Sequence, residues 1–405
     1  MNPSTAQPAV PRPSANRRRA ARAPRQRRGF VTVLLVLLLV VAIAAAALAI
    51  NWAYLVTVFR HMQQTTDTLS LAAAPQVLDD ALLCDMNCDN VDESLVTKEV
   101  VAAYLSLTNQ EVSARLQMSE SDLLCTLGRI ENPHLRLDDF VFEETTPYNA
   151  LRVEAFRTAS GDNPVAHLIG GFVGVDPADV RAVSYAVLDS QVIGFCPRPG
   201  ILSPVVPLAI DATAYAARTA DADGDDIREF TLQLNSSDSD VAADATGALI
   251  DLGDVAIDIA TILTQIEAGG VSASDLAGGK LGPLGSGPTM DYPDNPGPLG
   301  LPAQQQSPNE TDTEALVATL TTIAGSDNPK RVFPVYSSIG SGEAQLTGFV
   351  AARIVSAVDE AEGGDTEHQR LSITIEPCYL IHTTTWTSAV AAARNLYVYQ
   401  LRLVR

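Results

Sequence analysis

The clearest hydrophobic pattern in the chain is an uninterrupted apolar run near the N-terminus. No charged residue occurs from Phe30 to Phe59, and the strongly apolar core extends from Phe30 to Ile50. As a helix with a rise of 1.5 Å per residue, this core spans about 31 Å, which matches a hydrocarbon thickness of roughly 30 Å. Trp52 and Tyr54 follow, where interfacial aromatic residues are expected. The pattern predicts one transmembrane helix with Phe30, Ile50, Trp52 and Tyr54 as its anchor and interface residues.

Helical spacing of apolar residues continues beyond this run. The residues that maintain it are Tyr54, Val58, Met62 and Leu69, and Pro75 then provides a stop signal. We therefore expect one helix across residues 29–75, whose second half forms a stalk outside the membrane. With about 45 residues it would measure some 65–70 Å. The alternative is a kink or break near Asn51.

The rest of the chain alternates between short helical and strand patterns, which is typical of an α+β fold. In the region 76–200 we expect helices at 99–107 and 118–127, the second opening at Ser119 or Ser121. We also expect strands at 149–158, 179–189 and 192–196, with 179–189 as the partner of 149–158. In the region 201–405 we expect helices at 256–267 and 314–324 and strands at 230–234, 332–336, 346–358, 370–376 and 396–404. The sequence thus predicts a mixed region at 76–200 and a strand-rich region at 201–405, both outside the membrane.

Two stretches have a composition that does not support a packed core. Residues 1–28 are rich in Pro, Ala and Arg, which predicts a disordered basic tail. Residues 278–309 are dense in Gly, Pro, Ser and Gln, which predicts a long loop within the strand-rich region.

Charge is distributed very unevenly along the chain. The formal net charge is -21, yet residues 1–29 hold eight arginines and no acidic residue. Positively charged flanks stay in the cytoplasm, so we expect a cytoplasmic N-terminus, a single pass through the cytoplasmic membrane and an extracytoplasmic C-terminal region. The acidic body argues against nucleic acid as a partner, because phosphates would repel it. The predicted partner of the helix is the lipid bilayer.

Other interpretations of the apolar segment remain open. A cleavable signal peptide has a shorter apolar region of about 7–15 residues, although Ala47-Leu48-Ala49 resembles a cleavage site. Arg27-Arg28 suggests a twin-arginine export signal, but the following segment is more hydrophobic than such signals usually are. A prepilin-type peptidase would cut after Gly29 and leave the helix intact. We expect a retained anchor, with Gly29 as a possible processing position.

A set of short motifs surrounds and follows the apolar run. They are Arg27-Arg28-Gly29, Ala46-Ala47-Leu48-Ala49-Ile50-Asn51, Tyr54-Leu55, Arg60-His61-Met62-Gln63, Asp67 and Leu71-Ala72-Ala73-Ala74. Together they resemble the N-terminal segment of TadG-like proteins, within the TadE/TadG-like group linked to assembly of Flp (Tad) pili. The stretch from Asn149 to Thr158, followed by Asp176 to Leu188, is similar to a strand-rich part of such proteins. The resemblance implies an envelope protein with pilus or secretion-machinery proteins as partners.

The chain departs from this family pattern at several positions. Asn51 and Ala53 stand where the family tends to have Asp and Gly, and Leu34 stands where cleaved pseudopilins carry Glu. Larger TadG proteins often contain a von Willebrand A domain with an Asp-x-Ser-x-Ser metal motif. Asp238-Ser239-Asp240 is not such a motif, so the adhesion chemistry of that domain is not expected here.

The best candidate for ligand chemistry is an acidic cluster. Asp221, Asp223 and Asp225 alternate in a predicted turn, where hard carboxylate oxygens can bind Ca²⁺. The EF-hand pattern needs Gly at its sixth position and an acid at its twelfth, and this cluster does not fit that register. The alternative is a solvated acidic turn, and no other cofactor is predicted.

Cysteine, histidine and serine give little sign of catalysis. The five cysteines (Cys84, Cys88, Cys125, Cys196 and Cys378) all follow the apolar run, where one or two disulfides are permitted. Cys84 and Cys88 alone are a poor metal site because no further ligand accompanies them. The histidines are scattered, and no Gly-x-Ser-x-Gly nucleophile motif occurs. We therefore predict no catalytic residue and a non-enzymatic protein.

Two functional hypotheses follow. The first is a membrane-anchored, non-catalytic envelope protein that supports Flp/Tad-type pilus or surface assembly. The second is an extracytoplasmic ligand-binding sensor or adhesin held by the same helix.

Overall fold

The computed structural model describes residues 28–78, 93–108, 118–135, 140–146, 148–169, 176–219, 229–235, 247–250, 252, 259–284, 300–301, 310–339, 343–361, 369–389, 395 and 397–404. The chain divides into two compact units. The first contains Met1–Val56 and Ala166–Asp176, and the second contains Thr57–Val165 and Pro177–Arg405. Apart from Arg28, the predicted basic tail 1–28 lies outside the described residues.

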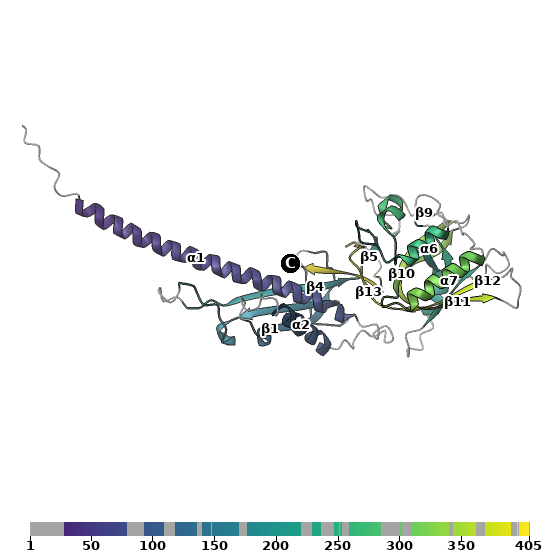
Figure 1. The fold of residues 1–405 in the computed structure, drawn as a ribbon. Helices are drawn as coiled ribbons and strands as arrows, with labels where there is room; N and C mark the ends of the chain where they lie inside the picture. Colours follow the sequence, from purple (N-terminus) through teal and green to yellow (C-terminus); the bar gives the residue numbers. More distant parts are fainter. Residues whose placement is uncertain are drawn as a thin grey trace, which may run out of the picture. The chain divides into compact units, whose positions relative to one another are not determined.

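Helix α1 is the longest element of the chain. It runs from Arg28 to Ala73 and has 46 residues (Figure 1). No Pro occurs within it, its one Gly (Gly29) lies in the first turn, and it is rich in the strong helix formers Leu and Ala. A short 3₁₀ turn, η1 (Ala74–Val77), carries Pro75 and closes the helix. The predicted long helix is therefore confirmed, and the alternative of a break near Asn51 is wrong.

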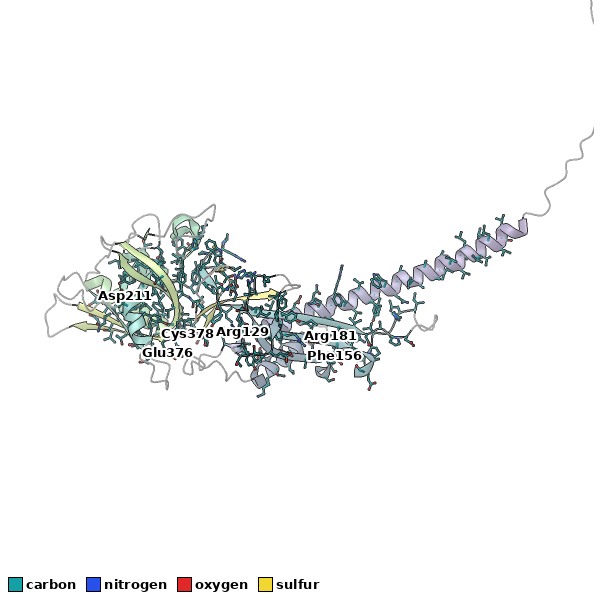
Figure 2. All side chains as sticks on the ribbon, turned by 180° about the vertical axis from the view of Figure 1, so that it is seen from behind. Arg129, Phe156, Arg181, Asp211, Glu376 and Cys378 are labelled. Carbon is teal, nitrogen blue, oxygen red and sulfur yellow. The ribbon has the colours of Figure 1, made fainter. Side chains whose placement is uncertain are left out.

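A six-stranded sheet in the second unit has the order β13-β15-β4-β3-β1-β2. Its strands are β1 (Leu123–Ile130), β2 (Phe142–Glu143), β3 (Ala150–Arg157), β4 (Val180–Asp189), β13 (Leu380–Ile381) and β15 (Val398–Val404). The predicted pairing of β3 with β4 is confirmed as an antiparallel ladder that matches Ala150 with Val187 and Phe156 with Arg181. Figure 2 labels Phe156 and Arg181 side by side on these strands. The last strand, β15, pairs antiparallel with β4.

Helices cover one face of this sheet. The second half of α1 and α2 (Glu93–Thr108) pack here. Their buried residues on the helix side are Leu69, Ala73, Val96 and Val100, and those on the sheet side are Leu127, Leu151, Val153, Ala186 and Leu188. The opposite face carries a smaller apolar cluster, in which the ring of Tyr185 contacts Phe140 and Phe142. Both faces of the sheet thus carry an apolar cluster, and the core lies mainly on the helical side.

One sequence-based assignment in this region is wrong. Residues 118–127 do not form a helix, because the short 3₁₀ turn η3 (Glu120–Asp122) leads directly into β1. Ser119 and Asp122 do form the expected cap, with the Ser119 hydroxyl 2.9 Å from the Asp122 carboxylate. The cap closes only a single turn, because pairing with β3 fixes the following residues as a strand.

A seven-stranded sheet forms the other large part of the second unit. Its main order is β7-β12-β11-β10-β6-β8, and β9 pairs with β11. The bounds are β6 (Leu208–Asp211), β7 (Phe230–Asn235), β8 (Gly247–Leu249), β9 (Gly300–Leu301), β10 (Lys330–Ile339), β11 (Glu343–Ala361) and β12 (Gln369–Pro377). The strands predicted at 230–234, 332–336, 346–358 and 370–376 are confirmed. The neighbours are antiparallel except for β6 and β10, which are parallel.

Three helices accompany this sheet. They are α5 (Ala212–Thr219), α6 (Ile259–Glu267) and α7 (Glu310–Ala324). Asp211 caps α5, because its carboxylate accepts hydrogen bonds from the backbone N–H groups of Thr213 and Ala214, each at 2.9 Å. Helices α6 and α7 lie over the sheet (Figure 1) and bury Ile266 and Leu320 against it. The other face buries Phe195 against Phe349, with ring centroids 4.9 Å apart.

The strand predicted at 192–196 belongs to a third, two-stranded sheet. Strand β5 (Val192–Phe195) follows β4 along the chain but pairs antiparallel with β14 (Thr385–Thr387). Within the predicted loop 278–309, the described part includes Leu281, which pairs through its backbone with Phe195, and β9. The other short 3₁₀ turns among the described residues are η4 (Ala159–Gly161), η6 (Ala273–Asp275) and η7 (Ala277–Gly279). The α+β layout expected from the sequence is confirmed.

Candidate functional site

The first half of helix α1 has the surface of a membrane-spanning segment. Its large apolar side chains from Val31 to Ile50 are exposed on every side of the helix. One helix in the described part of the chain is thus long and apolar enough to cross a membrane or act as a signal anchor. Fully burying a side chain such as Leu or Ile is worth about 1.5–3 kcal/mol, so water is an unfavourable environment for this surface.

The predicted interface residues lie at the end of this apolar surface. Ile50 is 49% exposed and Trp52 is 69% exposed, while Tyr54 is half-buried. Phe30 and Gly29 lie in the first turn of α1, which begins at Arg28. Cleavage after Gly29 would therefore leave almost the whole helix in place.

Asn51 differs sharply from its two neighbours in exposure. Only 8% of it is exposed, although Ile50 and Trp52 lie largely open. Its side-chain oxygen accepts a hydrogen bond from the backbone N–H of Ile169 at 3.0 Å, and 118 residues separate the two. Both residues belong to the first compact unit. A polar side chain at the end of the apolar run is thus satisfied by a distant segment of the chain.

The second half of α1 is a structural element of the body. The amide nitrogen of Gln63 donates to the Asp67 carboxylate at 3.0 Å and to the backbone oxygen of Val183 at 2.8 Å. The hydroxyl groups of Ser70 and Ser184 lie 3.0 Å apart in a buried setting. Because these polar contacts accompany the buried side chain of Leu69, the extension predicted as a stalk packs on the six-stranded sheet.

A polar cluster around the buried Asp189 joins three segments that are distant in sequence. The Asp189 carboxylate lies 2.9 Å from Nε2 of His134 and 3.3 Å from Nη1 of Arg402. Nη1 of Arg402 also lies 2.7 Å from Nδ1 of His134. The geometry fits a neutral imidazole that donates to Asp189 and accepts from Arg402. Burial and the nearby Arg402 lower the pKa of His134, although Asp189 opposes the shift.

A second hydrogen-bonded group contains a serine, a threonine and a histidine, and its hydrogen bonds are those of a turn in the chain. The hydroxyl of Ser203 lies 3.1 Å from that of Thr384, which in turn lies 2.8 Å from Nδ1 of His382. The backbone N–H of Thr384 also donates to this nitrogen at 3.2 Å. Burial lowers the pKa of His382. The histidine therefore organises its own turn, and Ser203 contacts the threonine.

The described cysteines occupy three different environments. Cys125 lies half-buried in β1, Cys378 is buried, and Cys196 carries a half-buried free thiol. Burial raises the pKa of Cys196, with Lys280 and Arg198 opposing the change. Cys84 and Cys88 lie outside the described residues. The sequence permits one or two disulfides without indicating which cysteines pair, and that expectation stays a prediction.

The predicted calcium ligands also lie outside the described residues. Asp221, Asp223 and Asp225 belong to the stretch 220–228. Within the part of the chain that the structure describes, no group of three or more His, Cys, Asp or Glu residues could hold a metal ion. The calcium site therefore remains a prediction from sequence alone.

Comparison with known proteins adds no relative. No protein-family profile, no curated protein and no solved structure matches this chain. The structural features themselves therefore carry the functional argument. Sequence reasoning missed the contact of Asn51 with Ile169, although an amide directly after an apolar run is a signal that such a partner is needed.

Proposed function

We propose that this chain is a single-pass membrane protein of the cell envelope, in which α1 is a retained signal anchor. The proposal rests on the difference in side-chain exposure between the two halves of helix α1. Side chains from Val31 to Ile50 are exposed and apolar, whereas Val58, Met62 and Leu69 are buried in the body. The exposed apolar residues of the first half favour an apolar environment. The buried residues of the second half belong to the folded body.

The orientation follows from charge. The arginine-rich residues before Phe30 favour the cytoplasmic side, so the acidic α+β body lies on the extracytoplasmic side of the cytoplasmic membrane. We further propose that the body acts as a non-catalytic scaffold, as the TadG-like pattern of its N-terminal segment suggests. Pilus or secretion-machinery proteins of an Flp/Tad-type system are the partners that this resemblance implies.

Alkaline carbonate extraction of membranes tests the anchor. The full chain is expected in the pellet, and a variant with Leu35→Arg and Leu38→Arg is expected to leave it. A single Arg at the centre of a span costs about 2.5–3.5 kcal/mol on insertion scales. Val355→Arg with Val358→Arg provides a matched control, because both valines are exposed on β11 outside the helix. Recovery of the unmodified chain in the supernatant would overturn the anchor.

N-terminal mass spectrometry separates a retained anchor from processing. A peptide that contains Met1 or Asn2 supports an untrimmed chain, and a new N-terminus at Phe30 indicates cleavage after Gly29. An N-terminus near Ile50 identifies a cleaved signal peptide and contradicts the proposal.

The scaffold role needs its own test. Deletion of the gene is expected to abolish surface pili, and the full chain but not the Leu35→Arg, Leu38→Arg variant should restore them. Genes for a secretion ATPase and a prepilin peptidase beside it would agree with this role. Normal piliation after deletion, with a kinase or transporter gene as neighbour, would instead favour the sensor hypothesis.

A further inference from the structure

The contact between Asn51 and Ile169 places a second apolar segment beside helix α1. Residues Ala166–Ile169 belong to the same compact unit as the first half of the helix. The backbone N–H of Ile169 donates to the Asn51 side chain at 3.0 Å. Asn51 directly follows Ile50, the last residue of the strongly apolar core. The segment is thus fixed at the level where the apolar surface of α1 ends.

Apart from His167, this segment has an apolar character that a water-exposed turn does not need. No Asp, Glu, Lys or Arg occurs from Pro164 to Val175. Leu168 is 59% exposed, next to the partly exposed Ile169. Trp52, which follows Asn51 on the helix, is also largely exposed. Apolar and aromatic side chains are therefore presented from two segments around the same hydrogen bond.

We propose that the Ala166–Ile169 segment is a second membrane contact, in which Leu168 enters the boundary between lipid headgroups and acyl chains. The inference rests on the proposed membrane anchoring by α1. If Phe30–Ile50 fills the hydrocarbon core, Asn51 lies at its extracytoplasmic edge, and a segment bonded to Asn51 lies at the same depth. Apolar side chains near a polar interface gain free energy by entering it, as amphipathic interfacial segments do.

A lipid surface fits this segment better than a protein partner. A specific protein interface usually buries about 1,200–2,000 Å² in total, with roughly 20–30 residues on each side. Leu168 and its immediate neighbours offer far less surface than that, but they adjoin a span that is itself proposed to lie in lipid. Asn51 has a defined role in this arrangement, because its side chain holds the segment against the helix.

Photocrosslinking in lipid vesicles tests the inference. A diazirine-bearing amino acid replaces Leu168, Leu39 or Val358, one at a time, in the full chain reconstituted into phosphatidylethanolamine and phosphatidylglycerol vesicles. Leu39 is exposed in the centre of the proposed span, and Val358 is exposed on β11. Mass spectrometry is expected to find lipid adducts at positions 39 and 168 and none at position 358.

The controls separate the two claims. Adducts at position 39 but not at position 168 would overturn the second membrane contact while the anchor stands. No adduct at position 39 would overturn the proposed anchor itself. Asn51→Leu, which removes the acceptor of the Ile169 N–H, should reduce the adduct at position 168 and leave that at position 39 unchanged. An equal yield at 168 in this variant would contradict the holding role of Asn51.

Discussion

The hydroxyl oxygens of Ser70 and Ser184 lie 3.0 Å apart in the core between helix α1 and strand β4. Both residues are at most 1% exposed. Ser70 also donates towards the backbone oxygen of Asp67 at 3.0 Å within its own helix. This pair connects the helix that carries the proposed membrane span to the sheet of the body, so the junction is specified by polar contacts as well as by apolar packing.

The two serines should respond differently to removal. Ser184→Ala leaves Ser70 with its bond to Asp67, and we expect a loss of about 0.5–1.5 kcal/mol in the free energy of unfolding. Ser70→Ala removes the one side-chain hydrogen bond that the described residues give to Ser184, so a larger loss of about 1–3 kcal/mol is expected. Urea denaturation of the full chain in detergent micelles measures both. The double variant should lose less than the sum of the single losses, and strict additivity would contradict the coupling.

Local patterns were sufficient to predict the long helix and the strand pair β3–β4. The absence of charge between Phe30 and Phe59, and the alternation along Asn149–Thr158, are both signals within one element. The same alternation is present in β1, where Leu123, Cys125 and Leu127 face one apolar cluster. It was missed because the cap at Ser119 also indicated a helix, and only the pairing with β3 decides between the two.

Long-range pairing could not be predicted in the same way. Strand β5 follows β4 but pairs with β14, and β15 returns from the end of the chain to β4. Arg402 and His134 meet across 268 residues. Such contacts depend on the assembled sheets, and no periodicity in one segment encodes the partner. For this reason, the long-range polar contacts of Asn51 and Asp189 could not be predicted from the sequence.

Two glycines with positive φ allow a matched test of how overlap at the Cβ position affects stability. Gly270 has φ +153°, and a Cβ atom there would overlap the backbone oxygen of Ser203. Gly200 has φ +78°, and no atom of the described residues lies within 4 Å of the corresponding Cβ position. Gly270→Ala should therefore destabilise the chain by about 3 kcal/mol or more, through both strain and overlap. Gly200→Ala should lose only about 1–2 kcal/mol, the penalty of the left-handed conformation. Equal losses in urea denaturation would contradict the role assigned to the Ser203 contact.

Glu154 provides a test of a buried carboxylate between two arginines. It is 2% exposed and forms ion pairs with Arg152 and with the mostly exposed Arg181. Arg181→Met should lose no more than about 1 kcal/mol, because Arg152 still compensates the charge. Arg152→Met combined with Arg181→Met leaves the Glu154 carboxylate buried and unpaired, and we expect this double variant to lose about 3–5 kcal/mol in the free energy of unfolding.

Non-additive losses of stability would show that the two arginines compensate the same buried charge. The double variant should lose more stability than the two single variants together, and adding Glu154→Leu to it should recover part of the loss because no buried charge remains. If the triple variant is as unstable as the double one, the loss arises from packing of the arginine side chains.

The His134 cluster predicts a pH dependence of stability with a defined sign. Burial lowers the pKa of His134 from its ordinary value of 6.5; the Asp189 carboxylate opposes this shift, and the smaller effect of Arg402 adds to it. The unfolded chain therefore binds this proton at a higher pH than the folded chain. As the pH falls below 6.5, the unfolded state is favoured increasingly until the folded pKa is reached, so stability decreases towards acidic pH.

Urea denaturation of the full chain at several pH values between about 5.5 and 7.5 measures this dependence. His134→Gln removes the titrating group while its amide can still donate to Asp189, so the decrease in stability should become shallower. The pKa of His382 is also lowered by burial, so His382→Asn should remove a separate part of the slope and the double variant should be flatter than either single one. A His134→Gln profile parallel to that of the unmodified chain would show that the imidazole takes up its proton equally in both states. In that case the effect of Asp189 on the pKa of His134 would cancel the effects of burial and Arg402. This result would contradict the lowered pKa of His134.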